Sequence, residues 1–367
     1  MIPFVQSLIT ALIFVFMLGV LVVIHELGHF VTARLARIRV LEFGVGFPPR
    51  AKVLRSEGET LYTLNWLPIG GFVRLEGEDG DSDDPRSFVN ASLTTKVVVL
   101  LAGVAMNLLL AFAIFFSIAW LANPTVGIHL MEVQADSPAQ TAGLVVGDTV
   151  TTLDGAPFYY EIPTPEGRAP AAAALFERAG QTVQLGVTHA DGTTETIPVT
   201  LRTADQIAVG KGALGVSLES RTTGTNAGRP IGEAFTTALK WTRDALSLIV
   251  GGLAQLVDSI VNRPTEPPPV AGPIGIASQV GDVFWQQGLV FTLLLAGILS
   301  ANLALVNILP FPPLDGGRIA VLLVKRLSGD RVSVRAERLT YLVGFVFLMS
   351  FLAWITFFDI TAPGRGQ

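Results

Sequence analysis

The sequence has no cysteine and little charge. Without cysteine the chain can form no disulfide and offers no thiolate to a metal, so any metal ion must be bound by nitrogen and oxygen atoms. Charged residues make up only 15% of the 367 residues, whereas half are hydrophobic, which is too apolar for an ordinary soluble protein of this size. The net charge of −5 is small and mixed in sign, which argues against a nucleic-acid partner. The composition therefore indicates a protein that has the lipid bilayer as its partner.

Four predominantly apolar runs are long enough to cross a bilayer, which takes about 20 residues. They cover residues 1–33, 97–122, 283–314 and 339–358. No lysine or arginine precedes the first run and no small-residue cleavage site follows it, so we expect this run to be retained rather than removed as a signal peptide. The fold class that follows is a membrane α-helical protein with about four transmembrane helices.

Basic residues near the ends of the spans predict their orientation. The first span has none before it, but three follow it and six separate the last two spans. These residues are Arg34, Arg37 and Arg39, and then Arg318, Lys325, Arg326, Arg331, Arg335 and Arg338. We therefore expect the loops 34–96 and 315–338 in the cytoplasm, and the N-terminus and the segment 125–220 outside.

Residues 229–262 predict an amphipathic helix. Their apolar stretch covers only residues 245–257, between two aspartates, which is short for a bilayer. A crossing here would also place the six later basic residues outside. We expect an interfacial helix, with a fifth span as the alternative, followed by a Pro-rich connector over 263–282.

The external segment 125–220 predicts a small β-rich domain. Its runs TVTTL, QTVQLGVT, TETIPVTL and GALGVSLE are typical of short strands, and Asp-Gly pairs at 154–155 and 191–192 indicate hairpin turns. The stretch SPAQTAGLVVGDTVTTLDG, residues 137–155, resembles the helix-turn-strand part of PDZ domains, which bind peptide ends at a sheet edge. The alternative is a spacer or a steric filter.

The stretch VVIHELGHF places three ionisable residues inside the first span. His25 and His29 are four residues apart on the predicted helix, so both rings lie on one face and can reach one ion. This is the H-E-x-x-H pattern of zinc sites, in which the glutamate, here Glu26, activates the attacking water. A hydrogen-bonded histidine pair is the structural alternative, but ionisable residues within a span are costly and usually functional.

A catalytic zinc needs a third protein ligand. The other histidines, His129 and His189, lie in the external segment, on the wrong side of the membrane. Asp315, in NILPFPPLDGG, lies at the inner end of the third span, at the same expected depth as the histidine pair. Prolines break the helix before it, and two glycines let the backbone turn tightly after it. The alternative is an aspartate in an ordinary turn at a helix end.

These motifs together resemble the site-2 protease family of intramembrane zinc metalloproteases, in its bacterial branch. The resemblance covers nearly the whole chain: HELGH in the first span, NILPFPPLDGG in a later one and one PDZ-like domain between them. It implies Zn²⁺ held by His25, His29 and Asp315, with Glu26 as the general base. It also implies a multi-pass protein of the bacterial cytoplasmic (inner) membrane whose active site opens toward the cytoplasm.

The resemblance also implies the substrates. They are transmembrane segments of single-pass membrane proteins, of the anti-sigma-factor or remnant-signal-peptide type, cleaved in regulated intramembrane proteolysis. The asparagines and the proline that hold substrate or shape the site in this family match Asn302, Asn307 and Pro310. An asparagine in a span is alternatively a hydrogen-bond partner of a neighbouring helix.

Two further stretches match the family. The loop 34–96 alternates like short strands around Gly70, Gly71 and Phe72, where the family has a membrane-dipping β-hairpin that meets an extended substrate; a plain cytoplasmic hairpin is the alternative. Asn107, in the second span, matches a family asparagine, but the proline that usually precedes it is absent. This departure weakens any role assigned to Asn107.

Two other functions fit part of the sequence. A membrane adaptor could recruit partners through the PDZ-like domain and keep a structural zinc, but a structural site has no use for a base beside its ligands. A transporter could use intramembrane histidine and aspartate as an ion path, but the sequence has no obvious inverted repeat. The protease interpretation explains all the motifs together.

Overall fold

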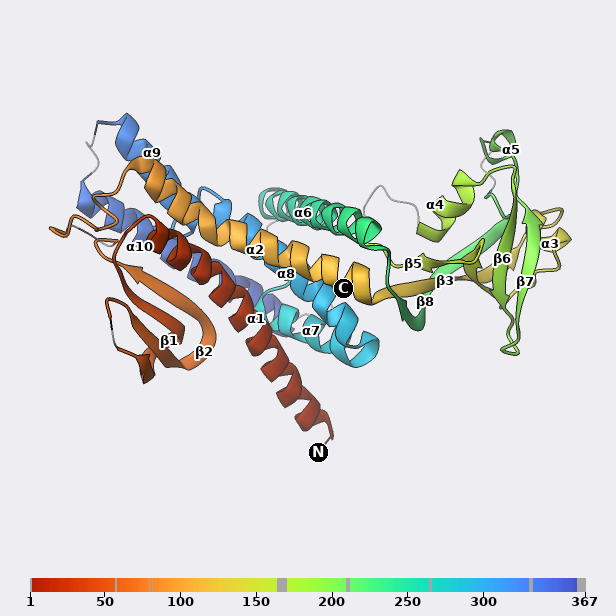
Figure 1. Ribbon diagram of the computed structural model, residues 1–367, viewed down its shortest axis with the longest axis horizontal. Helices are drawn as coiled ribbons and strands as arrows, with labels where there is room; N and C mark the ends of the chain where they lie inside the picture. The colour runs from red at the N-terminus through yellow and green to blue at the C-terminus, as the bar shows by residue number, and fades with distance from the viewer. Residues whose placement is uncertain are drawn as a thin grey trace. The chain divides into compact units, whose positions relative to one another are not determined.

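The fold is seen in a computed structural model (Figure 1). It describes residues 2–56, 58–78, 80, 82–163, 170–208, 212–263, 266–329 and 333–361. Of the basic residues used above for orientation, Arg331 lies outside this part. The chain divides into two compact units, one formed by Met1–Phe115 with Ala245–Gln367 and the other by Phe116–Asp244. Each unit is described by itself.

Long apolar helices dominate the first unit and its boundaries. They are α1 (Ile2–Leu35), α2 (Leu93–Leu121), α6 (Ile231–Asn262), α7 (Pro273–Gln287), α8 (Leu289–Ile308), α9 (Asp315–Leu327) and α10 (Val334–Thr361). Among the described residues, five helices are long and apolar enough to cross a membrane: α1, α2, α6, α8 and α10. Large apolar side chains such as Phe16, which is 74% exposed, lie on their outer surfaces, as expected of helices that have lipid as solvent.

Four of these five helices, α1, α2, α8 and α10, coincide with the predicted spans, but α8 starts later than its predicted span. Gly288, with φ of +82°, ends α7 and precedes α8. The predicted span over 283–314 is therefore a 20-residue helix, Leu289–Ile308. The connector predicted over 263–282 is also shorter, because α7 begins at Pro273. Proline is favourable in the first turn of a helix, where its missing N–H costs nothing.

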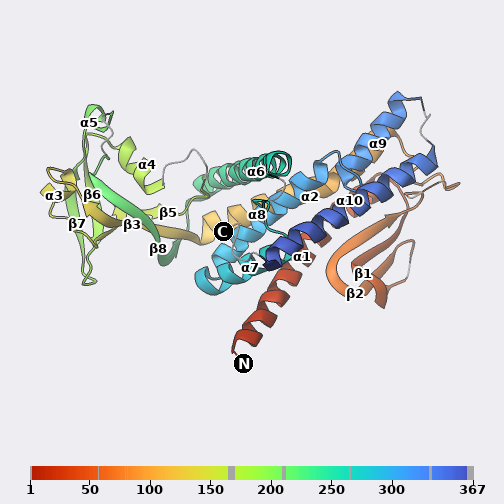
Figure 2. The same ribbon diagram turned by 180° about the vertical axis from the view of Figure 1, so that it is seen from behind.

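A long β-hairpin lies beside α1 (Figure 2). Strands β1 (Val40–Arg55) and β2 (Leu61–Leu75) pair antiparallel, as expected for the loop 34–96. The base of the hairpin packs against α1, where the Phe30 and Phe43 rings lie 5.1 Å apart. Its far end carries exposed apolar side chains, including Trp66, which is 71% exposed.

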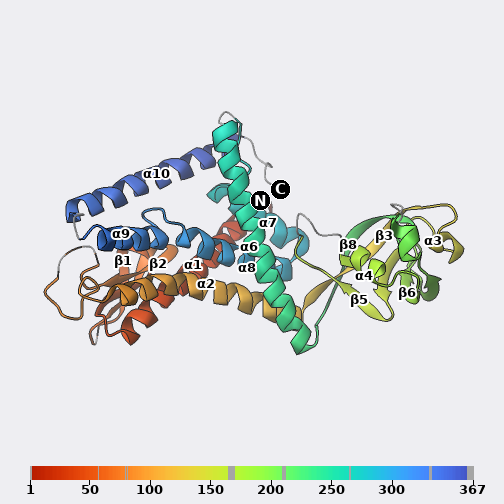
Figure 3. The same ribbon diagram turned by 90° about the horizontal axis from the view of Figure 1, so that it is seen from above.

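The second unit contains a six-stranded antiparallel sheet with strand order β7-β6-β4-β5-β3-β8. The strands are β3 (Asn123–Val133), β4 (Thr149–Leu153), β5 (Ala156–Tyr159), β6 (Thr182–Thr188), β7 (Thr194–Thr200) and β8 (Val216–Ala227). Short helices α3 (Pro138–Thr141), α4 (Pro170–Glu177) and α5 (Ala204–Ala208) complete it. Helix α4 packs Ala171 and Leu175 into the core of the sheet (Figure 3). The β-rich domain expected from the sequence is present in this unit.

Candidate metal centre

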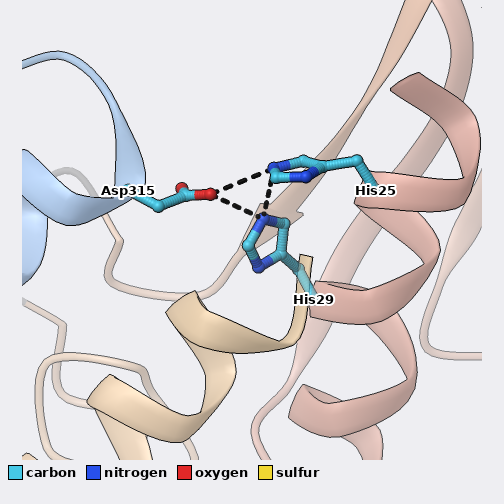
Figure 4. Close-up of side chains that lie close together, drawn as sticks. All are labelled: His25, His29 and Asp315. Carbon is cyan, nitrogen blue, oxygen red and sulfur yellow. Dashed lines mark hydrogen bonds and ion pairs between the residues drawn. The ribbon is translucent and has the colours of Figure 1, made fainter. Parts of the chain in front are cut away.

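Helix α1 places His25 and His29 side by side. They lie one turn apart, and their Nε2 atoms are 3.1 Å from each other (Figure 4). Both residues are only 6% exposed. Burying two imidazoles in an apolar helix is unfavourable without polar partners, so their common orientation requires an explanation from the residues that surround them.

Asp315, the first residue of α9, lies opposite this pair. Its Oδ2 is 3.0 Å from Nε2 of His25 and 3.3 Å from Nε2 of His29. In the described part of the chain, these three residues form the one group of histidine and carboxylate ligands close enough to share an ion. The structure thus brings together the three residues that the sequence predicts to meet across a separation of 290 positions.

The distances within this group fit a zinc ion. Zinc bonds to histidine nitrogen and carboxylate oxygen are about 2.0–2.2 Å long and usually tetrahedral, so two ligand atoms lie about 3.3–3.6 Å apart. The three separations of 3.0, 3.1 and 3.3 Å lie at or just below this range. Two imidazoles and one carboxylate are also the donor set of a catalytic zinc site, in which a fourth position stays open.

The glycines after Asp315 allow the start of α9 to approach the preceding backbone closely, and they do not form a turn. Gly316 and Gly317 are buried in the first turn of α9 and have no positive φ. A Cβ atom on Gly316 would overlap the carbonyl of Ile308, and one on Gly317 would overlap the backbone of Phe311. The expected tight turn at these glycines is therefore absent, and their role is to let α9 start against the chain that leaves α8.

Glu26 lies next to His25 in the helix and contacts the hairpin. Its Oε2 accepts a hydrogen bond of 3.0 Å from the backbone N–H of Val73 in β2. Gly71 lies two residues before Val73 in β2. It is so close to α1 that a Cβ atom there would be 3.2 Å from Val23 and 3.9 Å from Glu26. Strand β2 therefore fixes this carboxylate beside the histidine pair.

Helix α2 supports both rings from the other side. The Nδ1 atom of His29 lies 2.8 Å from the backbone oxygen of Val99, and the Nδ1 atom of His25 lies 3.3 Å from Nδ2 of Asn107. Gly103 lies between these contacts, and a Cβ atom there would be 2.5 Å from Nε2 of His29. Sequence reasoning missed Val99 and Gly103, because a backbone carbonyl and an absent side chain have no residue signature.

An ion pair connects α9 to the segment after the hairpin. Arg318, one turn after Asp315, donates to the carboxylate of Glu78, which also accepts from the backbone N–H of Leu75 over 3.1 Å. Burial disfavours the charge on Arg318, but the Glu78 carboxylate outweighs it and raises the pKa of the guanidinium above its usual range. The first turn of α9 is thereby held to the end of β2.

The other predicted site residues do not belong to this group of three among the described residues. Asn302 and Asn307 are half-buried on α8, and Pro310 is exposed in the segment that follows. Among the described residues, no hydrogen bond or ion pair joins these three to the histidines or to Asp315. On the hairpin, Gly70 adopts a φ of +85° and Phe72 follows Gly71 along β2.

Comparison with protein-family models matches residues 13–351 to peptidase family M50. The chain belongs to this family, the site-2 proteases. It is 32% identical over 353 residues to a "putative zinc metalloprotease" of Synechocystis sp., covering 94% of this chain and 93% of the relative. It is 29% identical over 364 residues to a "putative zinc metalloprotease" of Clostridium acetobutylicum, covering 98% and 99%.

A further relative is the zinc metalloprotease RasP of Geobacillus kaustophilus, which is 25% identical over 442 residues, covering 97% of this chain and 99% of the relative. This M50 protein is therefore a zinc metalloprotease with several apolar helices, as the sequence predicts.

Proposed function

We propose that this M50 protease binds Zn²⁺ through His25, His29 and Asp315 and uses Glu26 as the general base in hydrolysis of a peptide bond within the membrane. The observation that carries the proposal is the triangle of ligand atoms, with sides of 3.0, 3.1 and 3.3 Å. A structural ion pair has no need for two imidazole nitrogens and a carboxylate at zinc-binding separations.

The residues around the triangle have separate roles in this reaction. Zn²⁺ bound there would polarise the scissile carbonyl and lower the pKa of water. Glu26 takes the proton from the attacking water and passes it to the leaving amine. The hydrogen bond from Val73 holds the Glu26 carboxylate in place for both transfers.

The β1–β2 hairpin is the observation that supports binding of a transmembrane substrate in extended form. A helical span must unwind before its backbone can reach a metal, and strand pairing supplies the lost backbone hydrogen bonds. Strand β2 runs past Glu26, and its glycines Gly70 and Gly71 allow close packing against Phe47 and α1. These glycines and Phe72 are proposed to contact the substrate. Asn302, Asn307 and Pro310, on and after α8, are proposed to contribute to substrate binding.

The substrates we propose are single-pass membrane proteins, of the anti-sigma-factor or remnant-signal-peptide type, cleaved in regulated intramembrane proteolysis. The β-rich unit would act as a PDZ-like domain. Its strand β8 lies at the edge of the sheet, and an edge strand can pair with a peptide end. A size filter for untrimmed ectodomains is the alternative role of this unit.

The proposed location is the bacterial inner membrane, with the N-terminus and the β-rich unit outside and the metal centre opening toward the cytoplasm. The basic residues that follow α1 and those of α9 support this orientation. Helix α6 is proposed to lie in the interface. It carries Lys240 and Arg243 in its first half and Asp258 near its end, and Arg243 has a side chain that is 76% exposed.

Metal analysis combined with a cleavage assay tests this proposal. The protein is purified in detergent, its zinc content is measured, and it is incubated with a model single-span substrate. We expect Asp315→Ala to lose both zinc and cleavage, and Glu26→Gln to keep zinc but lose cleavage. Asp205→Ala, which changes an exposed aspartate in α5, is the matched control and should behave as wild type. Full zinc content in Asp315→Ala would refute the ligand set, and unchanged cleavage by Glu26→Gln would refute the role of Glu26 as the general base.

A further inference from the structure

Asn107 is a fully buried amide with one unpaired atom. It lies on α2 with 0% exposure. Its Nδ2 is 3.3 Å from Nδ1 of His25, and its backbone oxygen accepts a hydrogen bond of 2.8 Å from Oγ of Ser300. Its Oδ1 is one of three buried side-chain polar atoms in the described part of the chain that have no hydrogen-bond partner. Leaving such an atom unpaired is costly, so this amide requires an explanation.

The two histidines have different partners at Nδ1. His29 faces the backbone oxygen of Val99 at 2.8 Å. A carbonyl can only accept, so Nδ1 of His29 carries a proton. His25 faces the amide of Asn107, and a side-chain amide can either donate or accept. The tautomer of His29 is therefore fixed by its partner, whereas that of His25 is not.

When no metal ion is bound to His25, its Nε2 has the carboxylate oxygen Oδ2 of Asp315 as an acceptor at 3.0 Å. The proton of His25 is therefore on Nε2, and its Nδ1 is an acceptor. This agrees with the observed orientation of Asn107, in which Nδ2 points toward Nδ1 of His25 and donates to it.

Metal binding reverses this requirement. Nε2 of His25 can bind an ion only through its lone pair, so the proton of the neutral ring must then be on Nδ1. A protonated Nδ1 needs an acceptor, and Nδ2 of Asn107, which faces it in the structure, cannot accept. Rotation of the amide by a half turn about its last side-chain bond exchanges Oδ1 and Nδ2 without changing the shape of the side chain.

We propose that Asn107 is the positioning residue of His25 and that its amide turns over on metal binding, so that Oδ1 accepts a hydrogen bond from Nδ1–H. The proposal rests on the ligand set proposed above. Partners that hold a ligand ring in its tautomer typically contribute 10- to 100-fold to metal affinity. An amide at position 107 can hydrogen-bond to either tautomer of His25, because it can both donate and accept. The carbonyl of Val99 can only accept, so it pairs with a single tautomer of His29.

A packing role for Asn107 between α2 and α8 is the competing explanation. Two substitutions separate the two roles. Asn107→Leu keeps the size of the side chain but removes both donor and acceptor. Asn107→Asp keeps the acceptor that the metal-bound state requires, although removing a carboxylate from water costs free energy. Ser300→Ala disturbs the same helix contact without changing the amide and is the matched control.

The test is a competitive titration of the full-length, metal-free protein in detergent with zinc and a chromophoric chelator. We expect zinc affinity to fall about 10- to 100-fold in Asn107→Leu and to stay near or above the wild-type value in Asn107→Asp and Ser300→Ala. Wild-type affinity in Asn107→Leu, or an equal loss in Asn107→Asp and Asn107→Leu, would overturn the proposal. Asp315→Ala serves as a reference. Retained affinity in that variant refutes the ligand set itself, whereas its loss together with wild-type affinity in Asn107→Leu refutes the role of Asn107 alone.

A second measurement needs no substitution at Asn107. The chain has only four histidines, so ¹⁵N NMR of histidine-labelled protein can resolve each ring, with His129→Gln and His189→Gln for assignment. We expect the proton of His25 on Nε2 in the metal-free protein and on Nδ1 after zinc is added, while His29 carries its proton on Nδ1 in both states. A proton on Nδ1 of His25 in both states would overturn the proposal.

Discussion

The backbone N–H of Val73 donates a hydrogen bond of 3.0 Å to Oε2 of Glu26. This bond joins the hairpin to α1 beside the three proposed ligands. Strand β2 therefore has two functions in the proposed mechanism, since it aligns the substrate and also positions the base. A base must lie within hydrogen-bond reach of the proton that it takes, so the position of this carboxylate should matter as much as its chemistry.

Shortening the base tests this relationship. In Glu26→Asp the carboxylate is one methylene nearer to α1, so it can no longer reach both Val73 and the attacking water. We expect the zinc content to stay at the wild-type level and the cleavage rate to fall about 10²- to 10⁴-fold. Glu233→Asp, an exposed change in α6, controls for the loss of a methylene. Wild-type cleavage by Glu26→Asp would show that the bond to Val73 is irrelevant.

Adding one methyl group under the ligands should disrupt the centre. In Gly103→Ala the new Cβ atom would lie 2.5 Å from Nε2 of His29 and 2.7 Å from Cε1 of His25, so the rings must move. We expect zinc affinity to fall at least about 10-fold, because ligand geometry determines affinity. In Gly251→Ala, within α6, the Cβ atom meets nothing within 4 Å, and alanine should stabilise that helix slightly. Equal zinc affinities in the two variants would contradict this prediction.

Breaking the ion pair between Arg318 and Glu78 should destabilise the fold. In Arg318→Met the Glu78 carboxylate, whose side chain is only 15% exposed, loses its charged partner. We expect the free energy of unfolding, measured by titration with SDS, to fall by about 1–3 kcal/mol. Arg263→Met removes a pair in which both side chains are more than half exposed, and this loss should stay below about 1 kcal/mol. Similar losses in the two variants would contradict the structural role of Arg318.

His189 should make the stability of the β-rich unit depend on pH. Its ring lies 2.9 Å from Asp148 and 2.8 Å from Glu195, and these carboxylates raise the pKa of His189 above its ordinary value. The resulting stabilisation is complete below the unfolded pKa of about 6.5 and is lost as the pH rises through the higher folded pKa. The transition temperature of this unit, measured by calorimetry, should therefore fall as the pH rises above about 6.5.

His189→Gln provides the control for this pH dependence. Glutamine does not titrate, so the variant should lose the contribution of His189 to the pH profile and should differ from wild type most strongly in acid. Parallel pH profiles for wild type and His189→Gln would contradict the prediction. The metal centre should respond to neither change, because His189 belongs to the other unit.

The sequence predicts the meeting of His25, His29 and Asp315 better than it predicts the surrounding fold. A spacing of four residues on a helix brings His25 and His29 together without any tertiary information, and the shared depth of two spans predicts that Asp315 meets them. The supports supplied by Val99 and Gly103 could not be predicted in this way. They depend on the approach of α2 to α1, which tertiary packing determines.

Two elements that the predicted fold lacks, α7 and β3, have a proline at or near their start. The Pro-rich stretch predicts a connector over 263–282, although proline is favourable in the first turn of a helix, and Pro273 begins α7. The predicted strands do not include β3, which follows α2 directly and contains Pro124. This residue lies at the start of the strand, where a missing donor is tolerated.

Asp315 follows His25 by 290 positions, which has a consequence for how the enzyme is made. In the proposed ligand set the histidine pair is synthesised long before its third ligand, so a protein truncated before α9 would lack a complete site. Proteolytic activity should therefore begin only after α9 has been synthesised.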